Sequence, residues 1–188
     1  MKSKLVFLIG AGFLSGVINA SLFTTNPQAN DFFSTLVLPG LVYGLVTGAF
    51  FIYVLPVARS IFRIILWSIA SILSYTVAYF SVPTIIGPED ISFALAGSMG
   101  ALILCVAFSV LFQRMDWMQY FVVIATGAVV AYVVILNNDW NTDVGRGILL
   151  PFLPTLYIAW QTAVTTVLGL IPLLRNNRSD KRFTVEVV

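Results

Sequence analysis

Polar side chains that could contact a ligand or a neighbouring helix occur inside long apolar stretches of this sequence. Within residues 154–174, Tyr157, Gln161 and Thr165 recur every four positions and therefore share one face of a helix. The Gln161 amide carries donors and an acceptor oxygen, and leaving them unpaired in hydrocarbon costs several kcal/mol. Gln161 therefore either bonds to another helix or orients a bound molecule, and the sequence leaves both interpretations open.

Five other polar or aromatic side chains are expected in the same half of the membrane as Gln161, given the topology derived below. Groups of this kind that converge inside an apolar bundle are typical of a ligand pocket. Polar and aromatic residues also gather near membrane interfaces for solvation alone. The residues that we expect at a ligand site are Asn19, Tyr43, Tyr75, Tyr157, Trp160 and Gln161.

The residue types that carry common membrane chemistry are missing. The 188-residue sequence has no histidine, which excludes histidine acid–base catalysis and histidine-ligated metals. No Asp, Glu, Lys or Arg lies deep in an apolar stretch, whereas proton relays and voltage sensors place such groups there. We therefore expect no enzyme, no metal and no cofactor, and a neutral or amphipathic ligand is favoured over a highly charged one.

One loop has alternating oxygen-bearing side chains but lacks the remaining features of a calcium site. Residues 139–145 read D-x-N-x-D-x-G, whereas the calcium loop places its glycine one position earlier and a glutamate at position twelve. Val144 and Leu150 stand at those two positions. A solvated turn is the favoured interpretation.

The composition indicates that membrane-spanning helices carry these residues. Apolar residues make up 59% of the chain and charged residues 10%, against about 45–50% and about 25% in soluble domains. Charges separate six neutral stretches, each longer than the about 20 residues that a helix needs to cross the bilayer. The stretches lack the alternation of barrel strands. We expect an all-α polytopic bundle of six transmembrane helices, with cores near 5–23, 35–56, 62–81, 91–112, 119–136 and 154–174.

The basic residues predict how the six helices are oriented. If the chain crosses the membrane six times, all of its ten Lys and Arg residues except Arg146 lie on one side. The positive-inside rule then makes both termini cytoplasmic, in a multi-pass protein of the plasma (cytoplasmic) membrane. The alternative is a signal peptide cleaved after Ala20, which would leave five spans and an outside N-terminus.

The same charges predict the domain organisation and exclude one class of partner. We expect a transmembrane domain over 1–174 and a basic cytoplasmic tail over 175–188. The tail is interpreted as a topology signal, with contact to anionic headgroups as the alternative. The net charge is only +2 and the charged residues are scattered along the chain. They are too few to form a phosphate-binding surface, so nucleic acid is not an expected partner.

Small residues recur at four-residue spacing in several of the stretches. This spacing places them on one helix face, where the absence of large side chains lets two helices approach closely in lipid. Packing within one chain is the favoured interpretation, and a homo-oligomer seam is the alternative. The residues expected at such contacts are Gly12, Gly16, Gly40, Gly44, Gly48, Ala70, Ser74, Ala78 and Gly97.

Six spans, cytoplasmic termini, 188 residues and small residues in the first span form a layout similar to one known family. It is similar to the substrate-binding subunits of energy-coupling-factor vitamin transporters, in topology and size. The resemblance implies a pocket in the outer half for a neutral or aromatic nutrient. It also implies a separate motor subunit, because this chain has no G-x-x-x-x-G-K-[ST] phosphate loop. We therefore predict a small-molecule transporter or its membrane substrate-binding subunit, with a non-catalytic scaffold or accessory subunit as the alternative.

Overall fold

The computed structural model describes residues 2–25, 33–55, 57, 59–81, 89–139 and 152–185. These residues form helices and no strands, so the prediction of an all-α bundle of six helices is confirmed. The helices are α1 (Lys2–Thr25), α2 (Leu38–Val54), α3 (Ile61–Ser81), α4 (Glu89–Leu111), α5 (Trp117–Asp139) and α6 (Phe152–Val185). A five-residue π-helix, η1 (Phe33–Val37), leads directly into α2.

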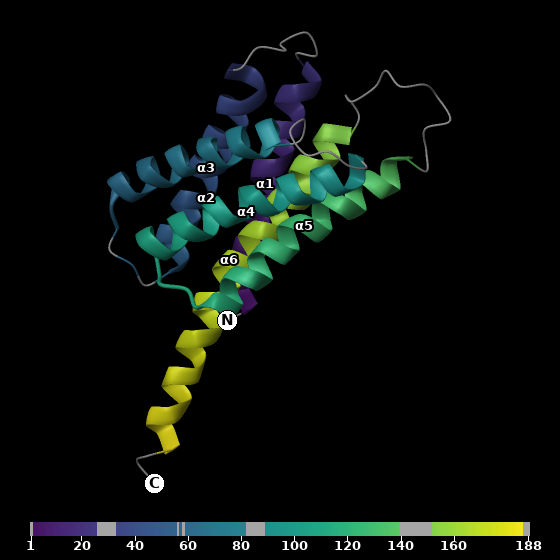
Figure 1. Ribbon diagram of the computed structural model, residues 1–188. Helices are drawn as coiled ribbons and strands as arrows, with labels where there is room; N and C mark the ends of the chain where they lie inside the picture. The colour runs from purple at the N-terminus through teal and green to yellow at the C-terminus, as the bar shows by residue number, and fades with distance from the viewer. Residues whose placement is uncertain are drawn as a thin grey trace.

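All helices except α2 are long and apolar enough to span a membrane. The 17-residue α2 is shorter, but it follows η1 directly in the chain, and the two together contain more than the about 20 residues that a helix needs to cross a bilayer. The helix α6 continues to Val185, so no break in secondary structure separates the span from the basic tail expected from 175. Figure 1 shows this end of α6 extending beyond the other helices.

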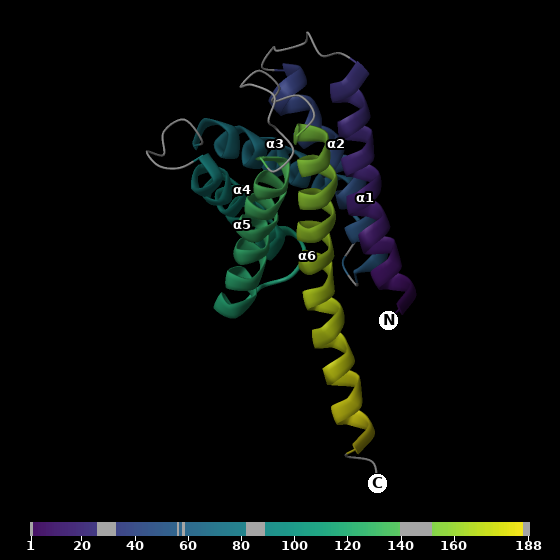
Figure 2. The ribbon, with the colours of Figure 1, turned by 90° about the vertical axis from the view of Figure 1, so that its right-hand side faces the viewer.

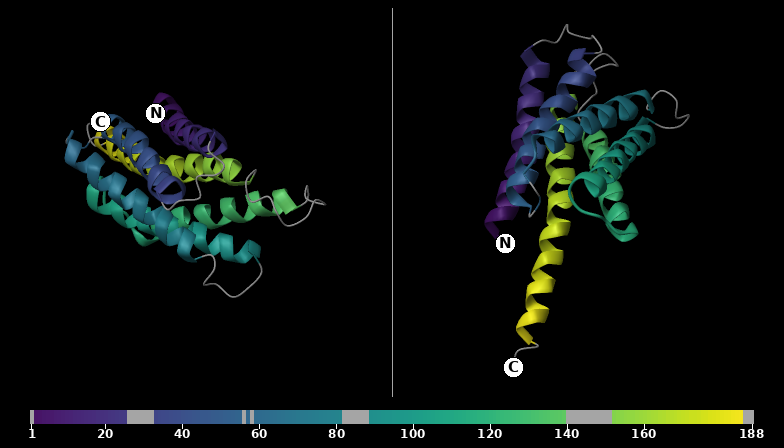
Figure 3. Two further views of the ribbon diagram at one scale, coloured as in Figure 1. Left: turned by 90° about the horizontal axis from the view of Figure 1, so that it is seen from above. Right: turned by 90° about the vertical axis from the view of Figure 1, so that its left-hand side faces the viewer.

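The six helices form a closed ring in which each helix packs on the next and α6 packs on α1. The contact between α1 and α6 is the most extensive of these, and the two helices run side by side in Figure 2. The helix α3 crosses their direction steeply in Figure 1 and in the right panel of Figure 3. Some neighbouring helices in the ring are therefore nearly parallel and others are strongly inclined. Side chains fill the interior that the helices enclose.

Two side chains cap the first turn of α5. The Asp116 carboxylate accepts a hydrogen bond from the Gln119 backbone N–H at 2.9 Å, and the Gln119 side-chain oxygen accepts one from the Asp116 N–H at 3.0 Å. This reciprocal pair is a capping box, which satisfies two backbone donors that the first turn would leave unpaired. The polar residues between α4 and α5 therefore allow a tight reversal.

Glycines form the closest helix contacts in the ring. A Cβ added at Gly44 would lie 2.3 Å from the Ser68 Cα, and one at Gly16 would lie 2.5 Å from the Ile158 Cα. Gly97 and Gly127 approach each other's carbonyl oxygens in the same way, at 2.5 and 2.6 Å. Glycine is thus required for α2 to contact α3, for α1 to contact α6 and for α4 to contact α5.

The other residues expected at close contacts occupy several kinds of position. Gly12 lies against Gln161 and Thr162, Gly40 against Ile72, and Gly48 against the Trp67 ring, whereas Ser74 and Ala78 face Gly100 of α4. Ala70 is only partly buried. The sequence analysis missed Gly100 and Gly127, which are the partners of its predicted residues on neighbouring helices.

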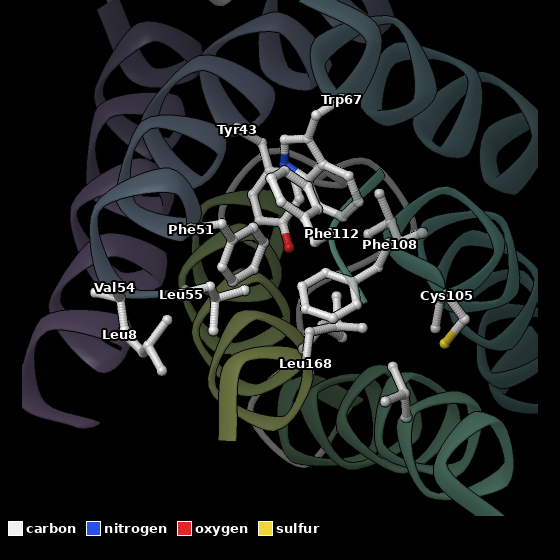
Figure 4. Packing of buried hydrophobic residues seen from close by; sticks show 14 of the residues in the cluster. Leu8, Tyr43, Phe51, Val54, Leu55, Trp67, Cys105, Phe108, Phe112 and Leu168 are labelled. Atoms are coloured by element: carbon white, nitrogen blue, oxygen red, sulfur yellow. The ribbon is translucent and has the colours of Figure 1, made fainter. Parts of the chain in front are cut away.

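Aromatic side chains fill the interior of the helix bundle at the end away from η1. Phe51 packs edge-on against Trp67, Phe108 and Phe112, with ring centroids 5.1–5.5 Å apart. These side chains come from α2, α3, α4 and the turn after α4, and they converge in the view of Figure 4. Edge-to-face pairs of this kind are favourable beyond their buried area, so this half of the bundle is closed by a packed core.

We expect Gly44→Ala to destabilise the bundle. Its Cβ would enter the Ser68 backbone, so α2 and α3 must separate, at a cost of about 1–3 kcal/mol in the free energy of unfolding. The matched control is Gly10→Ala, where the Cβ meets nothing within 4 Å and the better helix former is neutral or stabilising. Unfolding by SDS in mixed micelles, followed by tryptophan fluorescence, measures both. Equal stability of the two variants would contradict the close contact.

Candidate functional site

A half-open cavity of about 140 Å³ lies between the helices at the end where η1, α4 and α6 begin. Five elements contribute to it, because α3 and α5 also reach this end. Aromatic and small side chains make up most of the wall. The lining residues are Leu36, Ser74, Tyr75, Ala78, Tyr79, Phe93, Ala96, Gly97, Ala131, Leu156, Tyr157 and Trp160.

The cavity exists because small residues border it together with aromatic residues. Ala78, Ala96, Gly97 and Ala131 of α3, α4 and α5 supply almost no side-chain volume. Bulky rings from α3 and α6 also border the space, and the Tyr75 ring lies 5.9 Å from Tyr157 and 6.0 Å from Trp160 between centroids. These rings support one another, so they do not collapse into the space that the small residues leave.

The lining is almost entirely apolar. None of the lining residues is charged, and among the described residues no cluster of three or more His, Cys, Asp or Glu side chains could hold a metal ion. The Ser74 hydroxyl donates to the Gly100 carbonyl at 2.9 Å. The wall therefore offers mainly aromatic and aliphatic surface to a bound molecule, including the rings of Tyr75, Tyr157 and Trp160.

A buried hydrogen-bond chain behind the cavity joins three helices. The Ser15 hydroxyl of α1 donates to the Gln161 side-chain oxygen of α6 at 2.6 Å, and the Gln161 amide donates to the Tyr75 hydroxyl of α3. Gln161 is fully buried and does not line the cavity. Its amide points into the bundle, and it positions a tyrosine of the cavity wall.

A second set of hydrogen bonds supports the same wall from the centre of the ring. Thr165 of α6 donates to the Tyr43 hydroxyl at 2.9 Å, and the Trp67 indole donates to the Thr47 hydroxyl at 2.8 Å. The Tyr43 ring lies 6.3 Å from both Tyr75 and Trp160, and Figure 4 shows it beside Trp67. Tyr43 is thus a central packing residue that backs the cavity without lining it.

Asn19 lies apart from the cavity. Its side-chain amide donates to the Pro39 carbonyl at 3.1 Å, which ties α1 to the beginning of α2. Of the six predicted ligand residues, the structure brings Tyr75, Tyr157 and Trp160 together at the cavity. It places Tyr43 and Gln161 behind the cavity, and Asn19 at a helix contact.

Several lining residues were not among the predicted ligand residues. Tyr79 and Phe93 have the sequence pattern of interfacial aromatics, and only the fold shows that they border a cavity. Ser74, Ala78 and Gly97 were assigned to helix packing, which they also perform. Most of the loop 139–145, and the side chains from 175 onward, lie outside the described residues.

Trp160 has an unmet polar group beside the cavity. Its side chain is 8% exposed, and Nε1 has no hydrogen-bond partner among the described residues. Leaving a buried donor unpaired costs about 1–3 kcal/mol. Among the described residues, the other buried side-chain atom without a partner is Asn19 Oδ1, which belongs to a residue away from the cavity.

Comparisons with known proteins assign this chain to no family. No protein-family model matches the chain, and neither a curated protein nor a solved structure is significantly similar to it.

The bond between Ser15 and Gln161 should couple α1 to α6 energetically. In a double-mutant cycle of Ser15→Ala and Gln161→Leu, we expect a coupling of about 0.6 kcal/mol in the free energy of unfolding, the average for interhelical hydrogen bonds in membranes. Thr126 is the control, because it bonds only within α5. Its cycle with Gln161→Leu should be additive within about 0.3–0.5 kcal/mol. Equal coupling in both cycles, measured in mixed micelles, would refute the assignment.

Proposed function

We propose that this membrane protein binds a small uncharged molecule in the cavity and acts as a transporter or as the membrane substrate-binding subunit of one. The observation that carries the proposal is the aromatic-lined cavity at one end of an otherwise packed ring. Concave apolar sites with a few polar groups are the usual places for small molecules. The apolar, uncharged lining favours a neutral ligand.

The volume limits the ligand to a small molecule or to one part of a larger one. Drug-sized ligands occupy pockets of about 300–1,000 Å³, whereas an apolar cavity of about 150 Å³ accommodates benzene. The cavity of about 140 Å³ is close to the second case. A single ring therefore fits, and a larger ligand would have to extend beyond this space.

The rest of the ring supports a carrier in preference to an open pore. The core around Phe51, Trp67 and Phe108 closes the route beyond the cavity. Passage would therefore require helices to move, and close contacts built from glycine permit such sliding without large side chains to unlock. An energy source would come from a separate subunit, since the sequence has no phosphate loop.

A non-catalytic scaffold is the second candidate, and one observation favours it. Most buried polar side chains bond to neighbouring helices or to their own helix, as Gln161 does to Ser15 and Tyr75. In the scaffold interpretation, these bonds and the glycine contacts exist to hold a rigid subunit for a membrane partner or a second copy. Ligand binding at the cavity distinguishes the two candidates.

Ligand binding should depend on the open space beside Ala96. At about ten times the dissociation constant, benzene or benzamide should raise the melting temperature of the wild-type protein by a few degrees. Ala96→Leu fills the cavity and should remove this increase, whereas Ala49→Leu on the exposed face of α2 should keep it. Proteoliposomes should take up radiolabelled benzamide faster than protein-free liposomes, and Ala96→Leu should reduce the difference. A response that is absent, or unaffected by Ala96→Leu, would favour the scaffold.

We also propose that both termini are cytoplasmic, which puts the cavity in the outer half of the membrane. The support is the placement of nearly all Lys and Arg residues on one side of six spans. In a background that lacks Cys105, a membrane-impermeant maleimide applied outside should label a cysteine at position 89 and leave one at position 60 unlabelled. Labelling at 60 but not at 89 would reverse the orientation.

A further inference from the structure

We propose that the ligand is a single-ring aromatic compound with an uncharged hydrogen-bond acceptor, and that the Trp160 indole N–H donates to that acceptor. The inference rests on the proposed function, because it concerns the molecule bound in the same cavity. It makes Trp160 the residue that sets ligand specificity.

The shape and chemistry of the wall indicate an aromatic ring. The lining combines the rings of Tyr75 and Tyr157, whose centroids lie 5.9 Å apart, with the small residues Ala96, Gly97 and Ala131. A flat apolar group contacts both kinds of residue at once, and offset or edge-on pairing with tyrosine adds a specific attraction. A ring of benzene size matches the volume of about 140 Å³.

The unmet donor on Trp160 indicates the polar part of the ligand. A buried indole N–H usually finds an acceptor, and Nε1 has none among the described residues. Among the described residues, no side chain or backbone group around the indole, Ser74 of α3 included, is in hydrogen-bond geometry with Nε1, and the lining residues of α4 offer only apolar side chains or none. A carbonyl, ether or ring-nitrogen acceptor on the ligand would complete the bond without bringing a charge into the bundle.

The position of the indole makes this contact reachable. Trp160 Cζ2 lies 3.4 Å from where a Cβ on Gly100 would stand, and in indole the Cζ2 edge is the one that also carries Nε1. This edge therefore faces α4 beside Ser74 and Ala78, which both line the cavity. Nε1 has almost no accessible surface of its own, so the indole must rotate towards the cavity for the N–H to meet a ligand.

The rotation has a physical driving force. Pairing a donor that is otherwise buried and unpaired recovers its desolvation penalty, which for one group corresponds to about tenfold or more in affinity. A ligand of the same shape without an acceptor would leave the penalty in place. Sites built to pair a polar group discriminate strongly against analogues that lack it.

The test uses two probes of nearly equal shape. Acetophenone has a carbonyl acceptor, and in α-methylstyrene a methylene group replaces the carbonyl oxygen. After correction for partition into the micelles, acetophenone should bind the wild-type protein about tenfold more tightly. In Trp160→Phe the ratio should fall towards one. Incorporation of benzothienylalanine at position 160, where sulfur replaces the N–H, should have the same effect with the bicyclic shape retained.

A spectroscopic signal identifies the donor directly. With indole nitrogens labelled with ¹⁵N, acetophenone should shift the Trp160 N–H resonance to the frequency of a hydrogen-bonded indole, and α-methylstyrene should not. The Trp67 resonance is the internal control, because its N–H already bonds to Thr47 and should not change.

The outcomes separate this inference from the proposed function. Equal affinities for the two probes, with no shift at Trp160, would overturn the inference. If Ala96→Leu still abolished binding of the probes in that case, the proposed function would remain in place. Failure of both probes to bind would overturn both. If Trp160→Phe does not fold, the wild-type resonance still decides, because it needs no variant.

Discussion

Close approach of helix backbones at glycine is the constraint on which the rest of this bundle depends. Lipid tails are as apolar as leucine, so helices in a membrane associate mainly through van der Waals contact and hydrogen bonds. At Gly44, Gly16 and Gly97 a single methyl group would enter the backbone of the neighbouring helix. These three contacts lie on different pairs of neighbours around the ring, so they fix how the helices enclose the interior, and the aromatic core and the cavity follow from that enclosure.

The buried polar residues act on this frame in two ways. Gln161 and Thr165 lie one turn apart on α6, and each bonds to a tyrosine from across the ring, Tyr75 or Tyr43. The bonds satisfy groups that would otherwise be costly in hydrocarbon. They also hold the two tyrosines in place, one in the cavity wall and one directly behind it. The polar face of α6 therefore both stabilises the bundle and helps to shape the site.

Much of this architecture could be predicted from the sequence, because the signals are local. Apolar stretches between charges locate the helices to within a few residues, except for the end of α6, which continues into the polar tail. Four-residue spacing identifies Gly40 and Gly44 as a face that needs a close partner. The partners themselves depend on how helices cross, so Gly100 and Gly127 could not be assigned. Polarity correctly indicated that Gln161 is buried, but polarity could not distinguish a residue in a cavity wall from one behind it. Tyr79 and Phe93 illustrate the same limit, since an interfacial aromatic and a pocket aromatic have the same sequence pattern.

The cavity and the close contacts have a common origin in the same small residues. Gly97 allows α4 to meet Gly127 of α5 and also lines the cavity, and Ser74 and Ala78 both face Gly100 and border that space. Where two such helices diverge, residues too small to clash are also too small to fill the gap between them. The rings of Tyr75, Tyr157 and Trp160 do not fill that gap, because they pack against one another and Tyr75 is held by Gln161. A bundle that relies on small residues for contact therefore retains a hollow at its wider end. In the proposed function, the Trp160 N–H, which has no partner among the described residues, gives that space a chemical preference that a simple packing defect would lack.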